Sequence, residues 1–283
     1  MSYGPNPRQQ TVWDWRAAGN FVGGGAGSGL IAFAALAQVL GGTTRAPFAC
    51  GIVLVGFGLF CVWLEIGRPW RALHVFLHPK RSWMSREAFV AVLLLPAGLA
   101  AAFGVPGLAE LAGLLALVYM YCQGRILKAA RGIPAWREPR VVALIVATAL
   151  AEGAGLFLLS APAHGQVSAF LLAVAGVLLI VRWSLWRRYR EPIARSVAPP
   201  ALVALDAAAR RLKWLGTWAP LALLAVALAL HAAAATLPAL GVAALAGLGA
   251  VLAGALFKYT LITRAAFNQG FALTKLPVRG VRR

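Results

Sequence analysis

Long runs of apolar residues, separated by short polar links, make up most of the chain. A helix needs about 20 mostly apolar residues to cross the hydrocarbon of a bilayer, and eight runs reach or approach this length. The runs are continuous and do not alternate, so they predict helices and not the strands of a barrel. We therefore expect an all-α membrane protein, residues 1–283, with eight transmembrane helices in one domain. The predicted spans are 17–40, 47–66, 88–103, 108–122, 141–160, 167–186, 218–235 and 237–262.

Composition and charge agree with this pattern and add an orientation. Hydrophobic residues make up 61% of the chain and charged residues 12%, which is typical of an integral membrane protein. Every Lys and Arg except Arg45 falls before the first span, at the ends of spans two, four and six or in the links after them, or from the end of span eight onward. The positive-inside rule therefore predicts that both termini and these three links are cytoplasmic. Because the basic residues serve orientation, we expect no nucleic-acid partner.

The longest link, residues 187–213, has its own pattern. Its second half places Leu205 and Leu212 on one helical face, and Asp206 precedes Arg210 at a spacing of four residues. This arrangement predicts an amphipathic helix that lies along the cytoplasmic membrane interface.

The first span is rich in glycine. Gly23 and Gly27, and likewise Gly25 and Gly29, have the spacing that lets two helices approach closely. No strand precedes them, so the run does not indicate a nucleotide site. We predict close helix packing here, with Asn20, one turn earlier, linking helices or facing a cavity.

Few ionisable residues lie inside the spans. Glu152, midway along span five, is expected either to belong to a proton pathway or to be a neutral carboxyl bonded to a neighbouring helix. Lys258, near the end of span eight, is expected to extend to the interface. Only His231 among the His residues lies well inside a span, and the three Cys are too few to hold an iron-sulfur cluster. We therefore expect no haem, no iron-sulfur cluster and no metal site in this chain.

The densest polar stretch is residues 62–89, between spans two and three. It keeps two carboxylates, Glu65 and Glu87, close in sequence to Arg68, Arg71 and Arg86 at a membrane boundary. Ionisable groups near lipid are costly to retain, so this stretch predicts a functional site.

Four motifs resemble those of the DmsC/NrfD/polysulfide-reductase superfamily of membrane anchor subunits, and the order of the eight spans is also similar. The motifs are Leu-Glu-Ile-Gly-Arg-Pro-Trp-Arg-Ala-Leu at 64–73, Ser-Trp-Met-Ser-Arg-Glu at 82–87, Arg-Ile-Leu followed by Ile-Pro-Ala-Trp within 125–136, and Leu-Ile-Thr-Arg-Ala-Ala-Phe at 261–267. The resemblance implies an NrfD-like helical bundle in a bacterial or archaeal inner membrane. It also implies two partners, a ferredoxin-like iron-sulfur subunit and a molybdenum or tungsten pterin catalytic subunit, and electron exchange with menaquinone or ubiquinone.

The resemblance further implies roles for individual residues. One group would bind quinone near the iron-sulfur docking face, and a second group would contact the partner. The quinone-binding residues are Glu65, Arg68, His74, Arg264 and Asn20, and the docking residues are Arg71, Lys80, Arg81, Trp83, Arg86, Arg125 and Trp136.

Glu65 departs from the pattern of this superfamily. Many dimethyl-sulfoxide-reductase anchors have a His at this position that is linked to quinol binding. A carboxylate whose pKa is tuned by burial and a nearby Arg can exchange a proton with a quinone, so Glu65 is the expected catalytic residue, with His74 as another proton carrier. Alternatively, Glu65 only pairs with Arg68 or Arg71 and closes the end of the helix.

The predicted sidedness bears on the substrate. A cytoplasmic docking face implies a cytoplasmic catalytic partner, which suits a bulky intracellular substrate of the acyl-CoA type. Two alternatives remain open at this point. The chain can be a secondary transporter, which eight spans and Glu152 allow, or a purely structural anchor without quinone chemistry.

Overall fold

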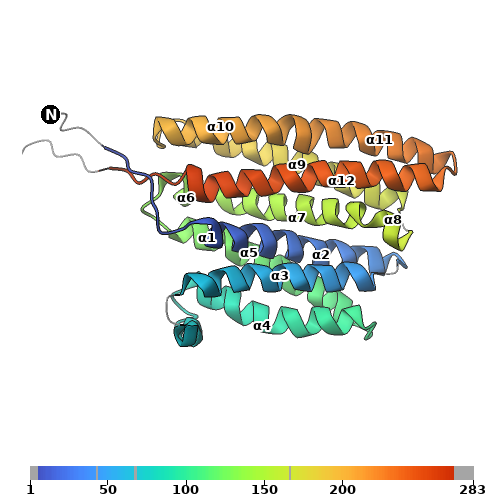
Figure 1. Cartoon of the computed structure of the whole chain (residues 1–283), viewed down its shortest axis with the longest axis horizontal. Coiled ribbons are helices and arrows are strands. Elements are labelled where there is room, and N and C mark those ends of the chain that lie inside the picture. The colour runs from blue at the N-terminus through green and yellow to red at the C-terminus, as the bar shows by residue number, and fades with distance from the viewer. Residues whose placement is uncertain (1–5, 43, 67–68, 166, 271–283) are drawn as a thin grey trace, which may run out of the picture.

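The computed structural model describes residues 6–42, 44–66, 69–165 and 167–270. Its long helices run side by side along a common axis (Figure 1). In this part of the chain, seven helices are long and apolar enough to cross a membrane, so the protein is an all-α, multi-pass membrane protein. They are Trp15–Val39, Arg45–Glu65, Trp83–Ala102, Val141–Leu159, Ala169–Ile193, Pro199–Ala232 and Thr236–Arg264.

The fourth predicted span is a helix but is not one of these seven. Helix α5 (Leu108–Ala129) has 22 residues and packs against α2 (Gly25–Val39), α4 (Trp83–Ala102) and α7 (Val141–Leu159). Its length suffices to cross the hydrocarbon. Its sequence is more polar than that of its neighbours because it contains Glu110, Gln123, Arg125 and Lys128, of which Gln123 is fully buried.

Three of the long helices contain a π-helical turn. The first span combines α1 (Trp15–Gly19), the turn η1 (Asn20–Gly24) and α2. A second turn, η3 (Trp214–Trp218), joins α10 (Pro199–Lys213) to α11 (Ala219–Ala232), and a third, η4 (Thr260–Arg264), follows α12 (Thr236–Tyr259). Such turns interrupt the regular α-helical hydrogen bonds and are often found at functional sites.

Glycine allows α2 to pack closely on two of its neighbours, α3 and α7, as its sequence predicted. A methyl group at Gly27 would lie 2.6 Å from the carbonyl oxygen of Gly51 in α3 (Arg45–Glu65). On another face, a methyl group at Gly29 would clash with the backbone of Ala149 in α7, where Gly153 also faces Gly29. The prediction of close packing is confirmed, and it places α2 between α3 and α7.

Short elements lie at the two ends of the bundle. The 3-10 helix η2 (Pro69–Leu77) connects α3 to α4, α6 (Pro134–Arg137) precedes α7, and α8 (Ala161–His164) precedes α9 (Ala169–Ile193). Helices α6 and α8 lie at opposite ends (Figure 1). Local capping fixes two of the long helices, since the side chains of Ser82 and Ser168 accept hydrogen bonds from Ser85 N and Leu171 N.

The two described ends of the chain meet at the α6 end of the bundle (Figure 1). Gln9 and Phe267 form an antiparallel bridge. Gln10 N donates to the Ala266 carbonyl at 2.8 Å, and Asn268 N donates to the Arg8 carbonyl at 2.9 Å. The segments before α1 and after η4 are thus held side by side.

The amphipathic segment 199–213 forms α10, which continues through η3 and α11 as one helix of 34 residues (Figure 1). At 1.5 Å per residue such a helix is about 50 Å long, whereas the hydrocarbon is about 30 Å thick. The helix is therefore longer than the hydrocarbon is thick, and α10 runs in line with α11. Its Asp206 binds Arg190 of α9 through two hydrogen bonds of 2.6 and 2.8 Å.

Candidate functional site

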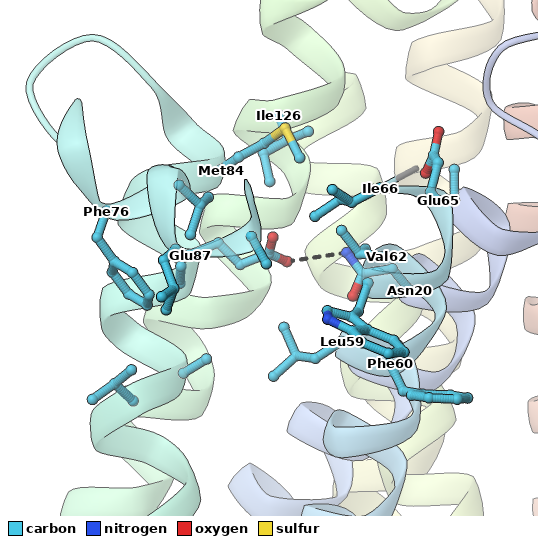
Figure 2. A pocket seen from close by; sticks show the side chains of 18 of the residues that line it. Asn20, Leu59, Phe60, Val62, Glu65, Ile66, Phe76, Met84, Glu87 and Ile126 are labelled. Carbon is cyan, nitrogen blue, oxygen red and sulfur yellow. Dashed lines mark hydrogen bonds between the residues drawn. The ribbon is translucent and has the colours of Figure 1, made fainter. Parts of the chain in front are cut away.

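A pocket of about 540 Å³ lies between α1, η1, α3, η2 and α4, towards the end of the bundle where residues 8–10 pair with 266–268. Most of its lining is apolar, and the ionisable or amide side chains in it are Asn20, Glu65 and Glu87 (Figure 2). A cavity of a few hundred cubic ångströms with a few converging polar groups is the usual form of a small-molecule site.

Helical spacing explains why Glu87 points into the pocket. The lining residues from α4 are separated by three or four positions and so share one face of the helix. Glu87 lies on this face and only 5% of its surface is exposed. The face consists of Met84, Glu87, Ala88, Ala91, Val92 and Leu95.

Glu87 belongs to a group of buried polar side chains that we call the pocket cluster: Asn20, Glu87, Tyr119 and Gln123. The amide nitrogen of Asn20 donates to Glu87 Oε1 at 3.4 Å, and the Tyr119 hydroxyl donates to Asn20 Oδ1 at 3.4 Å. Gln123 Nε2 donates to the Asn20 backbone carbonyl at 3.1 Å, while its Oε1 has no protein partner. A methyl group at Gly24 would lie 2.9 Å from both Tyr119 and Gln123, so this approach depends on glycine.

Glu65 lines the same pocket but lies apart from the Glu87 and Asn20 pair (Figure 2). It is half-buried at the end of α3, near the pair formed by Arg16 and Asp14. Arg16 donates to the Leu64 carbonyl at 3.0 Å, and its hydrogen bond to Asp14 lowers the pKa of that carboxyl. Glu65 therefore sits between the pocket and a charged, partly exposed surface.

One side of the pocket is bordered by exposed apolar side chains. Phe60 and Trp63 of α3, Leu73 of η2 and Val92 of α4 all line the pocket, and each is more than 40% exposed. In a membrane protein such a surface faces lipid, so an apolar molecule can reach the pocket from within the bilayer.

The structure brings together some of the residues that the sequence assigned to one site. Asn20 and Glu65 line the pocket. His74 is exposed on η2, and Arg264 is exposed with its guanidinium 6.0 Å from the Tyr259 ring; neither lines the pocket. Arg68 lies outside the described residues.

The residues assigned to partner docking fall into two groups. Arg71, Lys80 and Arg81 are exposed, and the guanidinium groups of Arg86 and Arg125 each lie over the ring of Trp83, at 4.1 and 4.2 Å. Trp136 differs from these residues because it faces inward. It is buried, stacks on Trp13 and donates to the Leu261 carbonyl at 2.9 Å.

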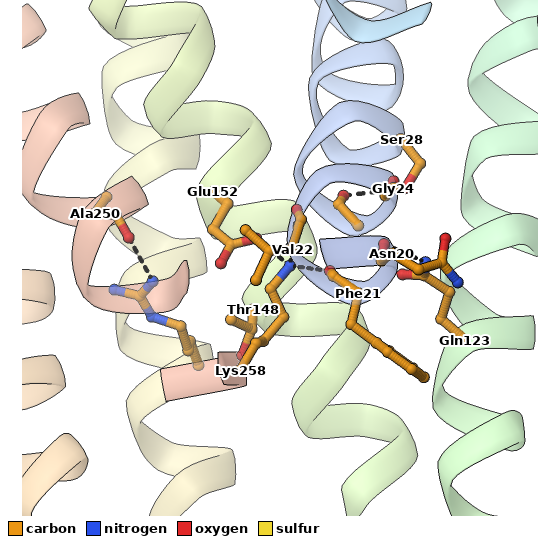
Figure 3. A network of polar contacts seen from close by, with 12 residues as sticks. Asn20, Phe21, Val22, Gly24, Ser28, Gln123, Thr148, Glu152, Ala250 and Lys258 are labelled. Carbon is orange, nitrogen blue, oxygen red and sulfur yellow. Dashed lines mark hydrogen bonds and ion pairs between the residues drawn. The ribbon is translucent and has the colours of Figure 1, made fainter. Parts of the chain in front are cut away.

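A second polar group, the closed cluster, contains Glu152, Lys258 and Arg182; Figure 3 shows Glu152 and Lys258 beside each other. All three side chains are fully buried, and Lys258 Nζ lies 2.5 Å from Glu152 Oε2. The expectation that Lys258 extends to the interface is therefore wrong, because an acid on α7 holds it inside the bundle. Arg182 donates to the carbonyls of Ala250 and Gly216.

Sequence reasoning noted Glu87 but gave it no role, and it missed Tyr119 and Gln123. The signal for Glu87 was its helical phase, since it shares a face with apolar residues three, four and eight positions away. Tyr119 and Gln123 are four residues apart on α5 and give no comparable signal, because polar residues also occur on its exposed face.

The sequence matches no protein-family model and no curated protein. The chemistry of the site therefore rests on its own geometry. An apolar slot with an amide, a carboxyl and an open side towards lipid fits a flat, lipid-soluble ring that carries carbonyl or hydroxyl groups. The unpartnered Oε1 of Gln123 behind Asn20 adds hydrogen-bonding capacity that the protein itself does not use.

Proposed function

We propose that this protein is the quinone-reactive membrane anchor of a multi-subunit oxidoreductase. The observation that carries the proposal is the pocket, which is apolar, open towards lipid and bordered by Glu87 and Asn20. Menaquinone and ubiquinone have this chemistry: an apolar ring with two oxygens that take up or release protons. The resemblance of the 64–73 and 82–87 motifs to those of membrane anchor subunits supports the same function, since both segments border the pocket.

Proton transfer would be the task of the two carboxyl groups. Reduction of a quinone takes two electrons and two protons, and oxidation of the quinol returns them. Glu87 would exchange a proton with the ring oxygen, and Asn20 would orient the ring by hydrogen bonding. Glu65, which lies between the pocket and the Arg16 and Asp14 pair, would pass protons to or from the aqueous side.

The electrons would come from or go to a ferredoxin-like iron-sulfur subunit that serves a molybdenum or tungsten pterin catalytic subunit. Trp83 with Arg86 and Arg125, together with the exposed Arg71, Lys80 and Arg81, supports a docking face close to the pocket. Electron transfer requires this proximity. A basic face fits a partner with an acidic surface.

We further propose that α5 is the eighth span and that both termini are cytoplasmic. The pairing of residues 8–10 with 266–268 supports a common side for the termini, and the basic links support the cytoplasmic side. The membrane would then be a bacterial or archaeal inner membrane. A cytoplasmic catalytic subunit would have access to bulky substrates of the acyl-CoA type.

Purification from native membranes in mild detergent tests the proposal. Mass spectrometry should find a cysteine-rich iron-sulfur protein and a pterin-containing subunit, and extraction should find quinone in a fixed ratio to the chain. A chain that is pure and free of both partners and quinone would contradict the proposal, and substrate flux in proteoliposomes would then favour a transporter.

The variant Glu87→Gln tests the role of the site itself. Loss of a general acid or base lowers rates by about 10²- to 10⁴-fold, so quinone turnover by the complex should fall within this range while assembly is kept. Glu65→Gln should lower turnover as well. Unchanged turnover in both variants would contradict the proposed proton transfer and favour a purely structural anchor without quinone chemistry.

A further inference from the structure

The three π-helical turns share one feature: a side chain from another helix donates a hydrogen bond to a backbone carbonyl of each. Buried carbonyls need such partners, because a π-helical turn interrupts the α-helical ladder. The donors are Lys258 for Phe21 and Val22 in η1, Arg182 for Gly216 in η3, and Trp136 for Leu261 in η4.

The turn η1 differs from the other two because it borders the pocket. Both Asn20 and Phe21 line the pocket, whereas no residue of η3 or η4 does. On one side of this turn, Lys258 Nζ donates to the carbonyls of Phe21 and Val22 at 2.5 and 3.4 Å. On the other side, Asn20 donates to Glu87 (Figure 3, with Asn20 and Lys258 on either side of the helix).

We propose that Lys258 is a positioning residue for the pocket: its hydrogen bonds to the Phe21 and Val22 carbonyls hold η1 in the π-helical form that presents Asn20 to Glu87. Lys258 touches neither the pocket nor Glu87, so it acts through one turn of backbone. The expected effect on quinone binding rests on the proposed function. The expected effect on η1 and on the hydrogen bond from Asn20 to Glu87 does not.

The residues around Lys258 hold its ammonium group next to η1. Glu152 holds the ammonium group at 2.5 Å, which fixes the direction of its remaining N–H bonds. A methyl group at Gly25 would lie 2.7 Å from Lys258 Nζ, and one at Gly254 would lie 2.6 Å from Glu152 Oε1. Glycine at both positions leaves room for the charged pair beside η1.

The decisive variant is the double substitution Glu152→Gln with Lys258→Met. It removes both charges, so no unpaired ion is left in the core, and it removes the donors to η1. The single variant Glu152→Gln is the matched control, because the glutamine oxygen can still accept a hydrogen bond from Lys258, which keeps N–H groups for the two carbonyls; its folded fraction is measured alongside, since it leaves the lysine without its ionic partner. A second control is Arg182→Met, which removes an equally buried cation that serves η3.

Binding of a short-chain benzoquinone or naphthoquinone to the purified full-length chain gives the first readout. Trp13 and Trp63 line the pocket, so their fluorescence should be quenched by the bound ring. Loss of hydrogen bonds that orient Asn20 should weaken binding by roughly three- to tenfold in the double variant. Glu152→Gln and Arg182→Met should bind as the unchanged protein does.

Infrared spectroscopy gives a readout that needs no quinone. The carboxyl stretching band of Glu87, identified by its loss in Glu87→Gln, reports the hydrogen bond from Asn20. The band should shift in Asn20→Ala and shift in the same direction in the double variant, but not in Arg182→Met.

The two readouts separate this proposal from the proposed function. An unchanged Glu87 band in the double variant, or an equal shift in Arg182→Met, would overturn the positioning role. Failure of the unchanged protein to bind either quinone would contradict the proposed function alone, because the infrared shift would still decide how Lys258 acts.

Discussion

The pocket cluster and the closed cluster are two solutions to the same problem, which is to keep polar side chains inside an apolar bundle. The pocket cluster is joined by bonds of 3.1 to 3.4 Å and borders a cavity. The closed cluster pairs an acid with a lysine at 2.5 Å, and none of its members lines this cavity. Both clusters contact η1: Gln123 donates to the Asn20 carbonyl, and Lys258 donates to the Phe21 and Val22 carbonyls.

The difference in bonding suggests that the pocket cluster serves ligand binding and that the closed cluster serves stability. Polar groups with short, charge-assisted bonds have little capacity for a ligand, and removal of one partner leaves a buried charge. Neutral polar groups with long bonds beside a cavity, such as Asn20 and Glu87, can exchange protein partners for a ligand. Single variants that break the charge pair of the closed cluster should therefore act mainly on folding, with a modest effect on binding through η1, and variants in the pocket cluster should act mainly on binding and turnover.

The largest effect on stability is expected from Lys258→Met alone. The substitution leaves the carboxyl of Glu152 without its ionic partner in the core, and breaking a buried ion pair typically costs about 3–5 kcal/mol. Denaturant unfolding in detergent measures this loss. The double variant with Glu152→Gln should recover most of it, and a double variant as unstable as the single one would show that the charge pair is not the cause.

Arg182→Met is expected to lower the free energy of unfolding by a smaller amount. The guanidinium donates to the carbonyls of Ala250 and Gly216, and hydrogen bonds to charged groups contribute about 1.5–3 kcal/mol. Unfolding should report a loss of this size. Quinone turnover of the folded complex should be unchanged, and a large drop in turnover would place Arg182 with the functional residues and break the comparison.

Trp136→Phe tests the third π-helical turn, η4, and should reduce the free energy of unfolding by less than the two variants above. Phenylalanine keeps an aromatic ring against Trp13 but cannot donate to the Leu261 carbonyl. One neutral hydrogen bond contributes about 0.5–1.5 kcal/mol, so the free energy of unfolding should fall by about this amount. Trp136→Leu is the comparison variant, because it removes the stacking as well and should lose more.

The outline of the fold could be predicted from hydrophobic runs, because span length and the glycine spacing of the first span are local properties. Seven of the eight predicted spans have a counterpart that meets the requirements for crossing a membrane. The continuation of α10 into α11 was not predicted, since the polar residues of the 187–213 link suggested a separate interfacial helix before the span at 218–235.

The candidate site was harder to predict because it depends on pairs that are distant in sequence. Asn20 and Glu87 are 67 residues apart, and Lys258 lies 237 residues from Phe21. Periodicity shows which face a residue occupies but not which helix that face meets. The charge of Lys258 near the end of its span suggested the interface, whereas its acid partner on α7 decides its position.

Glu87→Gln should have the smallest effect on stability and gives the sharpest test of the comparison. A glutamine oxygen can still accept the hydrogen bond from Asn20, and the substitution adds no charge and little volume, so unfolding should change by less than about 1 kcal/mol. The same variant is expected to reduce quinone turnover by two orders of magnitude or more, because the amide cannot exchange a proton with the ring. Lys258→Met should be much less stable than Glu87→Gln but retain more turnover per folded molecule. If Glu87→Gln instead unfolded the protein as readily as Lys258→Met does, Glu87 would be part of the structural core, and the pocket would lose the group on which its proposed chemistry depends.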